Sequence, residues 1–487
     1  MPEITGRTIL KGTDHTAVAR QALDQLFKTA GGRQGLWGAN GELWAWNGSR
    51  WANRPRTEIE RTLIEWVEDA WVLTDVDEGG QGTYSRATSE LSGRDIREVM
   101  WVLERMAQAQ VQSVPRWLEA GDWPDPDHCI AFQDVVLDVR GSTALRAAGR
   151  SDYVVYPRDD RFFGPGVLTV PFAPGGACPT WLACQDQWSN GDALWQEVRE
   201  RAYGYACMAT RKYGKALLEY GKSQSGKGSG TNSVLSKLLL APAYHSATVD
   251  QVIEGHGMDG LHLAQVWIVP EVRDMDRGAG AKFSTILKVV LGGDASMVNI
   301  KFVRQLKGVR FKAFPMMQAN AMPTMPDDAG SVSSKLIVLP FTNSFADRRD
   351  EDLPFKLATE LPGIAARFAE AAVRLEMAPA GEKWPVVSGA AELLAHMALD
   401  GNIFDAFLKW AFIKTEGNTP VSEDYVMAKR AAFEHDIGLQ LRRRDGRRIP
   451  DSQLLFYLET ASSWRVNRVR LTSGGMGLRG IQLRSIV

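Results

Sequence analysis

Apolar and polar positions follow two different periods along the chain, and their alternation predicts the fold class. Apolar residues recur every three or four positions, the spacing of an amphipathic helix, over residues 17–31, 56–74, 91–112 and 180–212. Between residues 216 and 345, short apolar runs of strand length alternate with helical segments; the runs are 216–220, 261–270, 311–318 and 335–341. Such alternation is typical of a parallel sheet. An α/β unit with buried parallel strands is therefore predicted for the middle of the chain.

Two regions flank this unit, and their patterns differ from it. Before it, helical segments are joined by strand-like stretches such as residues 129–139, which predicts an α+β accessory region. Residues 157–179 are rich in proline and glycine, as in a linker, and helical patterns return after residue 352. We therefore expect three regions, at residues 1–195, 196–375 and 376–487. This number suits 487 residues, because domains commonly hold about 100–200.

Four tryptophans gather in a short stretch near the N-terminus. They flank two turn signals, Asn40–Gly41 and Asn47–Gly48, which together predict a small β-meander. Either these side chains pack one face of that sheet or they stack on nucleic-acid bases. The four residues are Trp37, Trp44, Trp46 and Trp51.

Composition and charge narrow the class of protein without identifying it. The net charge is −1, so any nucleic-acid contact has to come from a local basic channel. Four cysteines without a CxxC pair favour a reducing compartment, and His128–Cys129 has no second half that would complete a zinc site. There is neither a signal-peptide core nor an apolar run of roughly 18 residues. A cytoplasmic protein without a membrane partner is therefore expected.

The stretch after residues 216–220 has the pattern of a phosphate-binding loop. It reads Gly221-Lys-Ser-Gln-Ser225-Gly226-Lys227-Gly228-Ser229, which matches Gly-x4-Gly-Lys. In this motif the glycines let backbone N–H groups face phosphates, the lysine reaches the β and γ oxygens, and a hydroxyl holds magnesium. The preceding strand and the helix expected over residues 232–240 complete its usual context. The pattern predicts a site for ATP and Mg²⁺; the alternative is a flexible Gly/Ser loop.

Gly228 departs from the motif, because a serine or threonine ordinarily follows the lysine directly. Ser229 or Thr231 would have to supply the hydroxyl for magnesium, or water would take that place. We assign the metal contact to Ser229. The predicted nucleotide contacts are Gly221, Ser225, Gly226, Lys227, Gly228 and Ser229.

A second apolar run ends in a carboxylate that suits nucleotide hydrolysis. The run Leu263 to Pro270 is followed directly by Glu271. An acid at this place polarises the attacking water or holds the metal, and Pro270 occupies the position where a second acid often lies. Glu271 is thus predicted to serve both the water and Mg²⁺, unless it is only a surface glutamate after a core strand.

The order of these motifs resembles the superfamily III helicases of the phage and poxvirus primase-helicase branch. After the loop and Glu271 come Lys288-Val-Val-Leu-Gly-Gly-Asp294, then Met316-Met-Gln-Ala-Asn320 followed shortly by Pro323, then the closing apolar run 336–341. The likeness extends over roughly residues 30–375. It implies an AAA+-like P-loop ATPase core with a parallel sheet, preceded by the α+β accessory region and followed by a helical, winged-helix-like domain.

The same resemblance implies a working assembly and a set of catalytic residues. It implies a hexameric ring around single-stranded DNA, with ATP bound between subunits, and Asn320 at the γ-phosphate or the attacking water. The family has an arginine just before its closing strand that acts across the subunit interface. Lys335 occupies that place here and keeps the charge but not the bidentate fork, and Arg348 or Arg349 is the alternative. The expected catalytic residues are Lys227, Glu271, Asn320 and Lys335.

Two basic segments are candidates for contact with DNA. In the family a hairpin points into the pore, and residues 301–312 fit it, with Lys307–Gly308 as the expected tip. Its cations bind DNA phosphates or form a solvated edge that blocks aggregation. Residues 441–487 carry ten arginines against three acids, which fits a winged helix or a basic tail for an acidic partner. The assigned DNA contacts are Lys301, Arg304, Lys307, Arg310, Arg465 and Arg468.

Three functions are compatible with these features. The first is an ATP-driven DNA helicase for replication of a phage, plasmid or mobile element. The second is a DNA translocase or defence ATPase that moves on DNA without unwinding it. The third is a DNA-binding scaffold with a degenerate ATP site, since Gly228, Pro270 and Lys335 all depart from the expected pattern.

Overall fold

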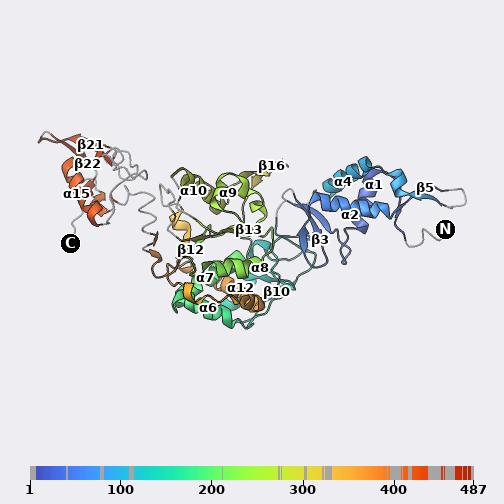
Figure 1. Ribbon diagram of the computed structural model, residues 1–487, viewed down its shortest axis with the longest axis horizontal. Helices are drawn as coiled ribbons and strands as arrows, with labels where there is room; N and C mark the ends of the chain where they lie inside the picture. Colours follow the sequence, from blue (N-terminus) through green and yellow to red (C-terminus); the bar gives the residue numbers. More distant parts are fainter. Residues whose placement is uncertain are drawn as a thin grey trace.

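In the computed structural model of the protein, the chain is elongated, with a helical N-terminal unit at one end and the C-terminal segment at the other (Figure 1). Among its described residues no helix is both long and apolar enough to cross a membrane. The structure describes residues 7–39, 42–76, 82–108, 114–210, 212–272, 275, 277–300, 304–320, 323, 332–391, 393–394, 407, 410–414, 419–436, 451–452, 454–455, 467–473, 475–479 and 481–483.

The N-terminal unit has a hydrophobic core of its own, built from residues between Leu10 and Ala107. A side-chain cap supports the start of α1, where the Asp14 carboxylate accepts from the Ala17 N–H at 2.8 Å. The helix predicted over 56–74 ends at Glu68, because the β-prone stretch from Trp71 pairs in register with its neighbours. The elements are β1 (Ile9–Leu10), α1 (His15–Gln25), β2 (Leu36–Ala39), β3 (Glu42–Trp46), β4 (Trp51–Asn53), α2 (Arg56–Glu68), β5 (Trp71–Val76), β6 (Gly82–Arg86), α3 (Ala87–Glu90) and α4 (Gly93–Gln108).

Strands β2, β3 and β4 form the predicted antiparallel meander, and its tryptophans pack. Trp44 and Trp51 are buried against Phe163, with ring centroids 5.9 and 5.2 Å apart. Gly48 turns between β3 and β4 with φ 93°, while Asn40–Gly41 lies outside the described residues. The arrangement matches the packed-face interpretation of Trp44 and Trp51, since a buried ring presents no face to a base.

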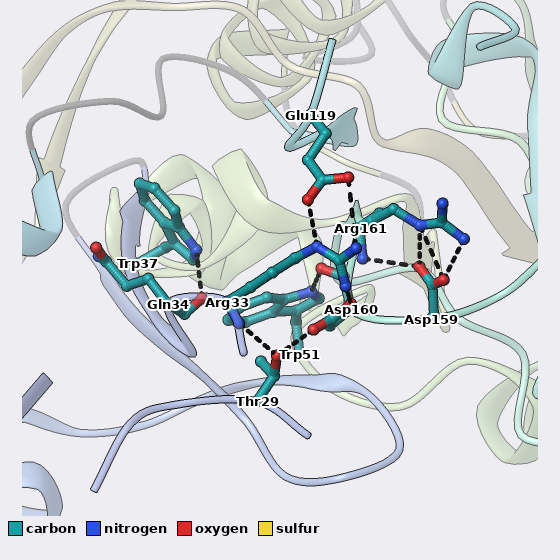
Figure 2. A network of polar contacts seen from close by, with 9 residues as sticks. All are labelled: Thr29, Arg33, Gln34, Trp37, Trp51, Glu119, Asp159, Asp160 and Arg161. Atoms are coloured by element: carbon teal, nitrogen blue, oxygen red, sulfur yellow. Dashed lines mark hydrogen bonds and ion pairs between the residues drawn. The ribbon is translucent and has the colours of Figure 1, made fainter. Parts of the chain in front are cut away.

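A polar network fastens this meander to the following region (Figure 2). Buried Asp160 accepts from the Thr29 hydroxyl and, at 2.7 Å, from Arg33, and its backbone carbonyl accepts from the Trp51 indole at 3.2 Å. Arg33 also binds Glu119. A buried carboxylate that is paired and hydrogen-bonded in this way fixes two segments more than 100 residues apart in the sequence.

The region between the meander and the main sheet is a mixture of short strands and helices. Strands β8, β9 and β10 pair antiparallel, as the strand pair predicted over 129–139 requires. The helical stretch predicted over 180–212 is two helices, because Asn190 and Gly191 adopt positive φ (54° and 76°) and end the first one. The elements are β7 (Arg116–Trp117), η1 (Pro126–His128), β8 (Cys129–Ala131), β9 (Val135–Asp138), α5 (Val139–Ala147), β10 (Val154–Pro157), β11 (Phe162–Phe163), α6 (Pro179–Ser189) and α7 (Ala193–Ala206).

The middle of the chain folds around a five-stranded sheet in which every pairing is parallel, in the order β13-β14-β17-β12-β18. The α/β prediction is therefore confirmed. The apolar runs contribute the central strands β14, β17 and β12 and the edge strand β18, although residues 261–263 of one run form a 3-10 helix. Almost all residues of these four strands are buried, as a sheet covered on both faces requires. The elements are β12 (Ala216–Gly221), η2 (Ser229–Leu235), α8 (Ser236–Leu238), β13 (Tyr244–Ser246), α9 (Val249–Ile253), η3 (His256–Met258), η4 (Leu261–Leu263), β14 (Val266–Val269), α10 (Arg277–Gly292), β15 (Ser296–Ile300), β16 (Arg304–Val309), β17 (Phe314–Ala319), η5 (Ser333–Lys335), β18 (Leu336–Phe341), η6 (Ala346–Arg348), α11 (Leu353–Thr359), α12 (Leu361–Met377) and η7 (Ala380–Glu382).

The hydrophobic core around this sheet draws on residues from Ile130 to Ala390. Helix α12 packs closely along α7, and Arg374 ties the two helices by binding Glu197 and Glu200 at 2.9 and 3.2 Å. One core thus extends across the predicted boundaries at residues 195 and 375. The domain limits stay predictions.

The C-terminal region pairs β20 (Val421–Ser422), β22 (Met476–Arg479) and β21 (Asn467–Arg470) in one small sheet, with α15 (Glu423–Asp436) against it. A second pair joins β19 (Phe412–Lys414) to β23 (Ile481–Leu483). The buried Arg430 guanidinium binds Glu434 and Asp451. The winged-helix assignment stays a prediction.

Candidate functional site

The glycine-rich loop follows β12 at the carboxyl edge of the sheet, between β17 and β18. This is the edge at which ligands bind in open α/β sheets. Two of its glycines are required by close packing. A Cβ on Gly221 would lie 2.1 Å from the Phe341 carbonyl oxygen, and one on Gly226, whose φ is 92°, would lie 2.0 Å from the Trp188 indole nitrogen. Only glycine fits at either position.

The loop wraps around the side chain of Lys227, which is almost fully buried. Its ammonium donates to the backbone carbonyls of Gly221 and Lys222, to the Ser225 hydroxyl at 3.2 Å and to the Asn320 side-chain oxygen at 3.0 Å. Burial lowers the pKa of Lys227, and the nearby carboxylate of Glu219 opposes that shift. The loop therefore holds one localised cation among oxygen acceptors, with Asn320 directly beside it.

Two further strands place side chains at the same edge. Asn320 follows β17 directly, and Glu271 lies two residues after β14. Both are exposed, and both line a cavity of about 1000 Å³ over the loop. That volume lies at the upper end of the range for small-molecule sites. The structure thus brings together Lys227, Glu271 and Asn320, and with them Ser225, Gly226, Gly228 and Ser229; Gly221 lies beneath the loop against Phe341.

Gly228 lacks the hydroxyl that would ordinarily hold magnesium, and the two residues proposed to supply it, Ser229 and Thr231, have different surroundings. Ser229 lines the cavity. Thr231 is buried, donates to the Gly228 carbonyl at 3.3 Å and accepts from Gln318 at 2.8 Å. Ser229 is accordingly the better placed of the two to reach a metal in the cavity. The helix after the loop starts with two α-helical residues, Lys227 and Gly228, and continues as a π-helical segment, η2.

The donor set allows a test of whether magnesium fits here. Within the described ranges no group of three or more His, Cys, Asp or Glu residues could hold a metal ion. His128 and Cys129 lie within these ranges and belong to no such group. Mg²⁺ does not need such a cage, because it usually keeps waters and binds through one or two carboxylates and the substrate phosphates. Glu271 and Ser229 at one cavity fit that mode.

Lys335 lies at the opposite edge of the sheet. It immediately precedes β18, whose first residue pairs with Ala216 at the start of β12, so the length of β12 (roughly 17–20 Å for six residues) separates it from the loop. Burial and the nearby Lys335 lower the pKa of Lys215, whose ammonium donates to the Ser334 carbonyl at 2.8 Å. Within one chain Lys335 does not line the cavity, and its role in a neighbouring copy stays a prediction. Arg349 does line it.

The predicted basic hairpin exists, but its tip is not where the sequence suggested. β15 ends at Ile300 and β16 begins at Arg304, so the connection spans residues 301–303, outside the described residues. The assignment of Lys307–Gly308 as the tip is wrong. Between Ser296 and Val298 the register shifts by one residue, and Gly308 has φ 71°, as in a glycine bulge. A Lys-Gly pair looks like a turn in sequence, yet here it bends a strand near the hairpin base.

The predicted DNA contacts are only partly described. Arg310 is exposed at the hairpin base and donates to the Gly293 carbonyl at 2.7 Å, and neighbouring Lys312 binds Asp127. Arg304 and Lys307 have described backbones in β16, as Arg468 has in β21, but their side chains lie outside the description. Lys301 and Arg465 lie outside it entirely. Their contacts with DNA stay predictions.

Several cavity residues come from segments that sequence reasoning passed over. They belong to α6, to the loop before α11 and to α11 itself, all far from the glycine loop in sequence. No local pattern marks them, because each is one position on an ordinary helix or, for Phe345, in a loop. They are Thr180, Cys184, Gln187, Trp188, Phe345 and Lys356.

Comparison with known proteins supports the fold alone. No protein-family model matches the chain, and no curated protein sequence matches it. Its fold is similar to the apo structure of the NrS-1 C terminal region (305-718), with a TM-score of 0.53 and 10% identity over 97% of this chain and 100% of that one. Two A form apo structures of the same region align with TM-scores of 0.49 and 0.48, at 10% identity, over 91% of this chain and 95% of theirs.

Proposed function

We propose that this chain is an ATP-dependent DNA helicase that works as a ring, expected to be a hexamer, in replication of a phage, plasmid or mobile element. The observation that carries the proposal is the cluster at the carboxyl edge of the sheet. The Lys227 ammonium lies 3.0 Å from the Asn320 side chain, in a glycine loop, beside a cavity of about 1000 Å³ that Glu271 also lines. These are the groups that an ATPase of the P-loop class requires.

Each residue has a distinct task in this proposal. Backbone N–H groups of the loop and the Lys227 ammonium bind the β and γ phosphates. Glu271 orients and deprotonates the attacking water, and Asn320 holds that water or a γ oxygen in line. Ser229 and Glu271 would hold Mg²⁺, which would supply positive charge against the phosphates. Within the ring, Arg349 or a neighbouring copy's Lys335 supplies the additional cation.

Motor activity further requires DNA contacts that respond to the nucleotide. The β15–β16 hairpin follows α10 directly, and α10 follows Glu271 in the chain, so a change at Glu271 has a short route to the hairpin. Its cations, together with the C-terminal arginines, would neutralise DNA phosphates. The similarity of fold to the NrS-1 C terminal region is compatible with this proposal.

The test is ATP hydrolysis with and without single-stranded DNA, and unwinding of a forked duplex. The key variant is Lys227→Ala, expected to lose about 100-fold or more of the activity because it removes a preorganised charge. Lys222→Ala is the matched control, since this exposed lysine of the same loop does not line the cavity. DNA-stimulated hydrolysis without unwinding would indicate a translocase. Nucleotide binding without hydrolysis in any condition would indicate a scaffold with a degenerate site.

A further inference from the structure

A buried polar cluster lies directly beneath the glycine loop. Its centre is Arg199 of α7, which is fully buried and donates to Glu219 at 3.0 Å, to Gln185 at 2.8 Å and to the Tyr203 hydroxyl at 3.2 Å. Burial alone would lower the pKa of Arg199, but Tyr203 and Glu219 outweigh it and the pKa is raised. Arg199 therefore stays charged inside the core, and its ion pair holds the Glu219 side chain in place on β12.

Gln318 of β17 joins this cluster to the loop. It stands opposite Glu219 in the parallel register, and its side-chain nitrogen faces acceptors only. These are the Lys227 carbonyl at 3.1 Å, the Thr231 hydroxyl at 2.8 Å and the Glu219 carboxylate at 3.4 Å. Because an amide nitrogen carries two hydrogens, the two shorter contacts satisfy it, and Glu219 keeps the amide from flipping.

Gln318 also lies next to the segments that carry Glu271 and Asn320. Its backbone carbonyl accepts from the Val272 N–H at 2.7 Å, directly beside Glu271. Asn320 follows two positions later and projects from the same face of the chain as Gln318. One buried residue thus touches the segments that carry Lys227, Glu271 and Asn320.

Close packing at Gly230 shows that the loop helix rests on this cluster. A Cβ at Gly230 would lie 2.2 Å from the Tyr203 hydroxyl and 2.5 Å from an Arg199 guanidinium nitrogen. The first turn of the helix therefore has little freedom to shift relative to α7, provided that Gln318 holds its other side.

We propose that Gln318 is a positioning residue, which clamps the loop helix to the Asn320 strand through Thr231 and the Lys227 carbonyl and so sets the geometry of the three catalytic groups. This inference rests on the proposed ATPase function for its effect on turnover, but the clamp itself can be measured without turnover. A misplacement of about 1 Å in such a site reduces rates by about 100-fold.

Two shape-conserving variants test the clamp. Gln318→Met removes the donor and Thr231→Val removes its acceptor, whereas Thr231→Ser keeps the hydroxyl and is the rescue control. In the apo protein, amide hydrogen exchange of residues 227–233 is expected to become at least tenfold faster in the first two variants and to stay near the wild-type rate in Thr231→Ser. With ATP and DNA, kcat is expected to fall 10- to 100-fold, while the Kd of a fluorescent ATP analogue stays within about threefold. The double variant Gln318→Met/Thr231→Val should be no worse than the more affected single variant.

The outcomes separate the clamp from the function. If exchange stays at the wild-type rate in Gln318→Met and Thr231→Val, the clamp does not exist and the inference is overturned. The inference is also overturned if hydrogen exchange and kcat change as much in Thr231→Ser as in Thr231→Val. It is overturned as well if ATP-analogue affinity and Tm fall together with kcat, since either result indicates a purely structural role. An inactive wild-type protein with fast exchange in the two variants would instead overturn the ATPase proposal and leave the clamp supported.

Discussion

The buried Arg199–Glu219 pair allows a quantitative prediction about stability. The two side chains are 0% and 1% exposed and 3.0 Å apart. The Arg199 guanidinium is also surrounded by aromatic rings at centroid distances of 4.7–5.5 Å, contributed by Trp181, Trp188, Trp195, Tyr203 and Phe341. Replacement by leucine keeps part of the packing but removes the cation that pairs with buried Glu219, which then keeps only neutral donors, the Tyr203 hydroxyl at 3.2 Å and the Gln318 amide at 3.4 Å. Breaking such a pair costs about 3–5 kcal/mol.

The size of the stability loss distinguishes this pair from surface ion pairs, and a double variant identifies the cause of the loss. Arg199→Leu is expected to lower the free energy of unfolding of the sheet region by about 3–5 kcal/mol, which corresponds to a fall in Tm of roughly 6–20 °C. Arg150→Leu is the control, because Arg150 and its partner Asp152 are 61% and 63% exposed and such pairs contribute under about 1 kcal/mol. If burial of the unpaired charge is the cause, the double variant Arg199→Leu/Glu219→Gln should lose at least about 2 kcal/mol less than the sum of the single variants.

The measurement is urea unfolding followed by tryptophan fluorescence, since three of the tryptophans surround Arg199. A loss below about 1 kcal/mol in Arg199→Leu would refute the argument, because water would then have to reach Glu219. Strict additivity in the double variant would refute it as well, since the loss would come from packing alone.

Three further predictions concern the cavity. Gly226→Ala should abolish binding of a fluorescent ATP analogue, because its Cβ would lie 2.0 Å from the Trp188 indole at a φ of 92°, whereas Gly175→Ala, at φ 76° with open space around it, should bind normally. Glu271→Gln should retain bound ATP in a filter assay and lose hydrolysis; unchanged turnover would remove Glu271 from the mechanism. Burial raises the pKa of the cavity-lining Cys184 thiol to about 11, so its alkylation at pH 7.5 should be slow and the rate should rise about tenfold per pH unit. Bound ATP should slow the alkylation further, as mass spectrometry can show. Equal alkylation rates with and without ATP would argue against nucleotide in this cavity.

Sequence periodicity was sufficient to predict the sheet because its strands are buried on both faces. The runs 216–220, 311–318 and 335–341 became β12, β17 and β18 with shifts of at most three residues at either end. Local turn chemistry was less reliable: Asn190–Gly191 divides one predicted helix, and Lys307–Gly308 forms a bulge instead of a hairpin tip. In both places the backbone conformation depends on packing or pairing that a local pattern does not contain.

The candidate site divides in a similar way. Lys227, Glu271 and Asn320 were found because each follows a strand, and parallel strands bring their carboxyl ends together. The residues that hold them in place were not found. Sequence periodicity assigns the positions of Arg199, Glu219 and Gln318 to the core. At such positions the sequence does not indicate which other side chain a charged or amide group contacts. Burial of polar groups in pairs is a tertiary property, and only the fold reveals it.

The extra residue at Gly228 and the π-helix that follows it are best understood together. A π-turn closes between residues i and i+5, one residue wider than an α-turn, so it accommodates one inserted residue without rotating the rest of the helix. The loop pattern has one residue too many between Lys227 and the first hydroxyl, and the segment Ser229–Leu235 is π-helical. Deletion of Gly228 should therefore convert this segment to an α-helix and place Ser229 next to Lys227, with Tm within about 4 °C of the wild type and Mg²⁺-dependent ATP binding at least as tight. Hydrogen exchange would report the change in the helix, and titration with a fluorescent ATP analogue would report the affinity for ATP. A loss of several kcal/mol would mean that the π-turn is needed for the Gln318–Thr231 contact itself, and that the widened helix is part of the clamp rather than an accommodation of Gly228.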